Sequence, residues 1–191
     1  DYRFMMRFVE ELICDAARAL VGSLQFEFRG KPIDLSPPWE QVSFAEAMAE
    51  LGLKPDAPLT EIQTVLRRKG IEVKGLSRSQ LVRLVEQMFE PKTKTKPLFV
   101  VDYWTELSPL AKAKPDDPSI AERFELFIGG MEGANAYSEL NDPIEQRRRF
   151  EAQLEPAGAR HETRDTGHVS RVPRPASRKM IDEGFLEALE Y

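Results

Sequence analysis

The stretch from Phe124 to Asp142, which reads FELFIGGMEGANAYSELND, constrains the fold of this chain more than any other. Its first half is rich in strand-forming apolar residues, Gly129-Gly130 is a two-residue turn signal, and small residues alternate with larger ones from Met131 to Leu140. This pattern predicts a β-hairpin. Because the segment is so apolar, we expect the hairpin to be central in its sheet.

Polar side chains interrupt this hairpin at Glu125, Glu132, Asn135, Tyr137 and Glu139. A buried strand seldom holds Glu or Asn, because an unpaired polar group out of water costs free energy. Asn135, Tyr137 and Glu139 are two residues apart, so they share one face of a strand. This spacing favours a rigid platform from which the side chains converge on a ligand. The structural alternatives are a helix cap or ion-pair partner for Glu139 and a turn-stabilising amide for Asn135.

The pairing of the two strands determines whether these side chains can meet. In an unbroken ladder, a turn at the two glycines pairs Glu125 with Ala134 and sets Glu125 beside Glu132. Both carboxylates then face away from Asn135. If all of these side chains serve one pocket, a β-bulge must lie between Glu132 and Asn135, and we expect it at Gly133.

Length and charge limit the classes of function. The 191 residues fit one domain or a large piece of one. The formal net charge of -5 argues against general binding to nucleic acid, which requires a basic surface. No apolar run in this sequence is long enough to span a membrane, and none has the pattern of a signal peptide, so we expect a cytoplasmic protein. The first residue, Asp1, is not Met, and Tyr191 falls within a predicted helix, which indicates a fragment.

Helical and strand patterns are present along the rest of the chain. Apolar spacing and capping residues predict helices from Tyr2 to about Val21, Ser43 to about Leu51, Glu61 to Lys69 after a Thr60 cap, Ser77 to about Phe89, Ile144 to Leu154, and Ile181 to Tyr191. Strands are predicted at Leu24 to Phe28, Pro32 to Leu35 and Leu98 to Tyr103, the last a continuous apolar run typical of a central strand. We expect residues from about 36 to 90 to form a helical insertion, and the Arg-rich residues from about 156 to 179 to form a flexible loop.

Several runs resemble class II lysyl-tRNA synthetases. The similarity includes ERFELFIGGMEGANAYSELNDPIEQRRRFEAQ from Glu122 to Gln153 and LFVVDYWTELSPLAKAKPDD from Leu98 to Asp117. It extends to DYRFMMRFVEELI at the amino end and IDEGFLEALEY at the carboxyl end, and its most specific part is the pattern E..AN.YSELND from Glu132 to Asp142. The resemblance implies an α+β fold, namely part of a mostly antiparallel synthetase sheet flanked by helices. It also implies that the family's first and third signature motifs lie outside this chain.

The resemblance also implies roles for the hairpin side chains. It places metal and ATP contacts on Glu125 and Glu132, and two adjacent carboxylates suit Mg²⁺ because hard cations take oxygen ligands. It assigns Asn135, Tyr137 and Glu139 to lysine, with Glu139 pairing with the side-chain ammonium. No side chain is expected to form a covalent intermediate, so positioning and charge neutralisation would supply the rate.

The implied reaction has two steps and several partners. Lysine is activated by ATP to lysyl-adenylate and is then transferred to tRNA(Lys), and the complete protein is expected to be a homodimer. Because arginines of the missing motifs would hold the α-phosphate and clamp the adenine side, we expect the isolated chain to be inactive or nearly so. Two alternatives stay open: a non-catalytic module that keeps the fold to bind lysine or a protein partner, and a ligase that attaches lysine to a protein.

Overall fold

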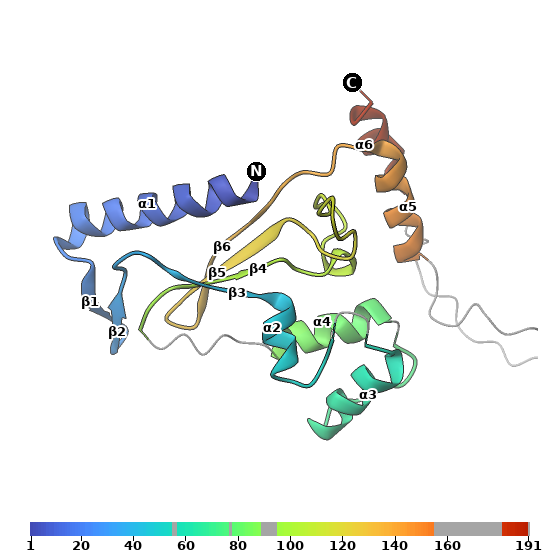
Figure 1. Ribbon diagram of the computed structural model, residues 1–191, viewed down its shortest axis with the longest axis horizontal. Coiled ribbons are helices and arrows are strands. Elements are labelled where there is room, and N and C mark those ends of the chain that lie inside the picture. The colour runs from blue at the N-terminus through green and yellow to red at the C-terminus, as the bar shows by residue number, and fades with distance from the viewer. Residues whose placement is uncertain (55–56, 77, 89–94, 155–180, 191) are drawn as a thin grey trace, which may run out of the picture.

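The four-stranded sheet is the centre of the molecule (Figure 1). The computed structural model describes residues 1–54, 57–76, 78–88, 95–154 and 181–190. The sheet has the order β3 (Glu40–Ser43), β4 (Leu98–Val101), β5 (Arg123–Ile128) and β6 (Met131–Tyr137), and a separate hairpin joins β1 (Gln25–Phe28) to β2 (Lys31–Asp34). The mixture of sheets and helices confirms the predicted α+β class.

Antiparallel pairing dominates the sheet, as predicted. Strand β5 pairs antiparallel with both β4 and β6, and only the β3–β4 pair is parallel. The apolar run of β4 is central, because it lies between β3 and β5. The prediction of a central hairpin is right for β5 and wrong for β6, which is the edge strand in the described part of the chain. All seven residues of β6 are exposed or half-buried, as suits a strand at the edge of a sheet.

Helix α1 (Tyr2–Val21) covers one face of this sheet, and its bounds match the prediction. The Asp1 carboxylate accepts a hydrogen bond from the backbone N–H of Phe4 at the start of the helix. Gly22 ends it in the left-handed conformation, at a φ of 76°. The buried face of α1 packs against the sheet side chains Phe99, Phe124 and Leu126.

Side chains on the opposite face of the sheet share one apolar core with three helices of the central region, α2 (Phe44–Ala49), α3 (Leu59–Arg68) and α4 (Arg78–Met88) (Figure 1). Helix α3 packs against α4. The predicted Ser43 cap is confirmed, because Ser43 and Glu46 form a reciprocal capping box. The predicted Thr60 cap is wrong. Helix α3 already begins at Leu59 after an extended Pro58, so Thr60 lies within its first turn. Ser77 lies outside the described residues, and β3 is not among the predicted strands.

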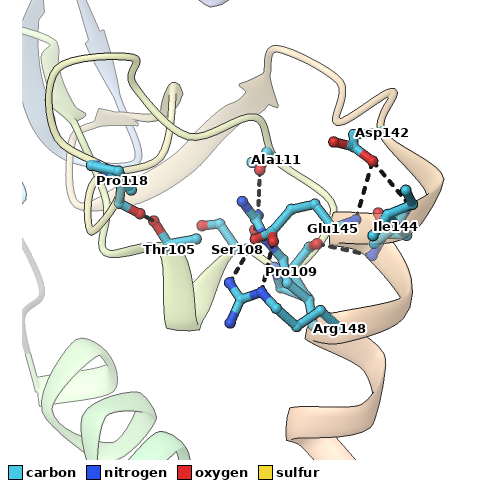
Figure 2. A network of polar contacts seen from close by, with 11 residues as sticks. Thr105, Ser108, Pro109, Ala111, Pro118, Asp142, Ile144, Glu145 and Arg148 are labelled. Atoms are coloured by element: carbon cyan, nitrogen blue, oxygen red, sulfur yellow. Dashed lines mark hydrogen bonds and ion pairs between the residues drawn. The ribbon is translucent and has the colours of Figure 1, made fainter.

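Two further helices follow the hairpin, α5 (Pro143–Leu154) and α6 (Glu183–Ala188). The Asp142 carboxylate accepts hydrogen bonds from the backbone N–H groups of Ile144 and Glu145 and so caps α5 (Figure 2). The carboxyl-terminal helix is shorter than predicted. The predicted loop at about 156–179 falls outside the described residues. No helix in the described ranges is long and apolar enough to cross a membrane.

Candidate functional site

A β-bulge at Gly133 sets Asn135 on the same face of the sheet as Glu125 and Glu132. Phe127 pairs with Glu132 and Leu126 pairs with Ala134, so Gly133 is the extra residue of β6. The bulge expected at this position is confirmed. As a result Glu125 lies opposite Asn135 rather than opposite Ala134, the partner it would have in an unbroken ladder.

The Asn135 amide links the two carboxylates. Its Nδ2 atom donates to Oε1 of Glu125 at 3.1 Å and to Oε1 of Glu132 at 3.3 Å. One NH₂ group therefore contacts carboxylates from two adjacent strands. Three of the five predicted residues are in direct contact.

Tyr137 and Glu139 follow Asn135 along the chain, at the end of β6 and just beyond it. Tyr137 is the last residue of β6, is half-buried and pairs with Arg123 in the ladder. By strand alternation its side chain shares the face of Asn135. Glu139 lies beyond the end of β6, where its backbone bridges to Ala111, and it is exposed. The structure brings Glu125, Glu132 and Asn135 together and leaves the Glu139 carboxylate open to solvent.

The two carboxylates differ in environment. The Glu125 side chain is only 11% exposed and forms an ion pair with Arg123, while the Tyr103 hydroxyl donates to its Oε2 atom at 2.7 Å. Glu132 is exposed. A buried carboxylate requires compensating partners, because removing its hydration costs several kcal/mol. Arg123 and Tyr103 supply that compensation.

Sequence reasoning did not identify Arg123 or Tyr103. Arg123 left one usable signal: it stands two residues before Glu125, so a cation and a carboxylate share one face of a strand. The sequence carries no comparable signal for Tyr103, because a tyrosine after an apolar run is most simply read as a core residue. Its hydroxyl reaches Glu125 only because β4 pairs with β5.

Helix α5 anchors the loop that follows β4 through contacts of its own. Arg149, only 7% exposed, donates from Nη1 to the Ala111 carbonyl oxygen at 2.6 Å, and Gln146 donates from Nε2 to the Pro109 carbonyl oxygen at 3.0 Å. The Glu145 carboxylate accepts hydrogen bonds from both Arg148 and Arg149, and Figure 2 labels Glu145 and Arg148. These hydrogen bonds, from Arg148 foremost, lower the pKa of the Glu145 carboxyl from 4.5 to about 2.

Comparison with known proteins identifies the family. The model of the family "tRNA synthetases class II (D, K and N)" matches residues 1–191. The chain belongs to the class II tRNA synthetases. Its hairpin, the bulge at Gly133 and the Glu125–Asn135 pair are therefore features of a synthetase sheet.

Several curated relatives in this class II family are lysine–tRNA ligases. The chain is 38% identical to the one from Nostoc punctiforme over an alignment of 198 positions that covers 100% of this chain and 32% of that protein. It is 38% identical over 196 residues to the one from Moorella thermoacetica, with 37% of that protein covered. It is 36% identical over 195 residues to the one from Bacillus subtilis, with 36% covered. The chain thus spans about a third of the length of these relatives.

Proposed function

We propose that this chain is part of the catalytic domain of a lysine–tRNA ligase, which activates lysine with ATP to lysyl-adenylate and then transfers it to tRNA(Lys). One observation supports this most directly: the bulge at Gly133 gathers Glu125, Glu132 and Asn135 at one place on the sheet. The names of the relatives supply the substrate class. The complete protein would act as a homodimer in the cytoplasm, where its substrates are.

The paired carboxylates fit Mg²⁺ with ATP. Glu125 and Glu132 present hard oxygen ligands from adjacent strands, and both already contact the positively polarised NH₂ group of Asn135. Within the described ranges no group of three or more His, Cys, Asp or Glu side chains could hold a metal ion. A cation here would therefore share its coordination with the nucleotide phosphates, which is common for Mg²⁺. When bound, the ion would neutralise charge on the phosphates.

The same face would bind lysine. Asn135 would hydrogen-bond the amino acid, and the half-buried ring of Tyr137 would flank its aliphatic stem. The exposed Glu139 carboxylate would pair with the side-chain ammonium, and a neutral isostere of lysine would leave that carboxylate unpaired. Neither step needs a covalent intermediate, so these residues would act by orienting lysine and by matching its charge.

Lysine-dependent exchange of pyrophosphate into ATP tests the proposal in the complete protein that contains this sequence. We expect exchange with lysine and not with norleucine, which has the same carbon chain but lacks the side-chain amino group. Glu139→Gln should raise KM for lysine by about a hundredfold, since a charge-assisted contact is lost. The matched control, Glu72→Gln, removes an exposed carboxylate of the helical region and should leave KM unchanged.

The other outcomes separate the alternatives. Lysine binding by calorimetry without any exchange would indicate a non-catalytic module. Exchange without charging of tRNA(Lys) would indicate a ligase that attaches lysine to another acceptor. Absence of both exchange and lysine binding would refute the proposal.

A further inference from the structure

The Arg123 side chain makes polar contacts both with the hairpin face and with the loop from Thr105 to Ala111. Its guanidinium forms the ion pair with Glu125 and donates from Nε to Oδ1 of Asn135 at 3.2 Å. It also donates from Nη1 to the Ser108 hydroxyl at 3.1 Å and to the Leu107 carbonyl oxygen at 3.3 Å. One side chain therefore joins β5, β6 and the loop from Thr105 to Ala111.

The Tyr103 ring fixes the plane of this guanidinium. The Arg123 Cζ atom lies 4.4 Å from the ring centroid, which is a cation–π contact. The Arg123 side chain is only 13% exposed. Because the guanidinium is planar and lies over the ring, its N–H donors point in fixed directions, and Nε–H points at Asn135.

The partners of Asn135 allow only one orientation of its amide. Arg123 has donors alone, so only the oxygen of the amide can face it. Glu125 and Glu132 are acceptors as carboxylates, so only the NH₂ group can face them. A flipped amide would set the NH₂ group against Arg123 and the oxygen against two carboxylates. All three contacts would be lost.

We propose that Arg123 is a positioning residue that locks the Asn135 amide with its NH₂ group toward the carboxylate pair. The lock depends on the shape of the guanidinium as well as on its charge. A lysine at this position would keep the charge but offers a compact ammonium without the planar fork, which cannot hold Glu125 and Asn135 in the same way. The effect on lysine binding rests on the function proposed above, whereas the lock itself does not.

The lock can be measured without any ligand. In the complete protein labelled with ¹⁵N-asparagine, the side-chain amide signal of residue 135 is assigned by its loss in Asn135→Ala. Arg123→Lys should speed exchange of these amide hydrogens with water at least threefold. Arg149→Lys is the matched control, because Arg149 is as buried and binds the same loop without contacting Asn135. Unchanged exchange in folded Arg123→Lys would overturn the proposal.

A double-mutant cycle tests the consequence for the ligand. We expect Arg123→Lys to weaken lysine binding about tenfold by calorimetry, and to weaken it less than twofold when Asn135 is already alanine, because the effect passes through Asn135. Arg149→Lys should change binding less than twofold. Equal effects of Arg123→Lys in the two backgrounds would overturn the proposal. If the wild-type protein binds no lysine, the proposed function fails and the amide exchange alone decides the role of Arg123.

Discussion

Glu125 and Asn135 face each other across β5 and β6, with 3.1 Å between Oε1 of the carboxylate and Nδ2 of the amide. They are partners only because Gly133 adds one residue to β6. Without that extra residue the side chain of Asn135 would lie on the other face of the sheet, because side-chain direction alternates along a strand. The bulge is therefore what makes one face of the hairpin polar.

The two carboxylates should differ in their effect on stability. Glu125→Gln leaves the buried Arg123 without its ion pair and should lower the free energy of unfolding by about 3 kcal/mol. Glu132→Gln changes an exposed side chain and should cost less than about 0.5 kcal/mol. Urea denaturation of the complete protein measures both. Equal losses for the two variants would contradict the ion pair's role.

Two glycines of the hairpin should respond in opposite ways to alanine. At Gly133 a Cβ atom would meet Cδ1 of Ile128 at 3.6 Å, an ordinary contact, so Gly133→Ala should stabilise by about 0.5 kcal/mol through lower chain entropy. At Gly129 the φ is +58° and a Cβ atom would lie 3.0 Å from Cδ1 of Ile33, so Gly129→Ala should destabilise by about 1 kcal/mol or more. Thermal unfolding curves of the two variants test this expectation. Lower stability in both variants would show that the bulge itself needs glycine.

Stability should fall in acid partly through Glu145. The pKa of its carboxyl is about 2 in the folded chain against an ordinary value of 4.5, so the stabilisation is complete above about pH 4.5 and is lost as pH falls toward 2. Because the side chain is 29% exposed, we expect only about 1 kcal/mol. Glu145→Gln should therefore lower stability at pH 6 and make little difference at pH 2. A constant difference across this range would argue against the ion pairs with Arg148 and Arg149.

Two arginines of α5 should contribute very differently to the free energy of unfolding. Arg149 is buried and donates to the Ala111 carbonyl, so Arg149→Ala should cost about 3 kcal/mol and loosen the loop from Thr105 to Ala111. Arg147 pairs with Glu183 in the open, at 44% and 58% side-chain exposure, and Arg147→Ala should cost less than about 1 kcal/mol. Hydrogen exchange of the loop amides checks the first expectation. Faster exchange there in Arg147→Ala would show that α6 also supports the loop.

Local patterns were enough to predict much of this fold. The α1 bounds follow from apolar spacing, the α2 cap from Ser43 and Glu46, and the central place of β4 from its continuous apolar run. The edge position of β6 could not be predicted this way, since strand order depends on pairing between distant segments. Strand β3 was not predicted for the same reason. Its four residues have no strand pattern of their own, and their hydrogen bonds with β4 hold them in the sheet.

The sequence by itself determined the hairpin, the identity of its polar residues and the need for a bulge, because turn residues and the two-residue period of strands act locally. Tertiary structure alone decided the partners of those residues. Arg123, Tyr103 and Asn135 meet around Glu125 only when β4, β5 and β6 are paired. A carboxylate can stay charged in the core only if donors surround it, and donors from separate strands reach it only in the folded sheet.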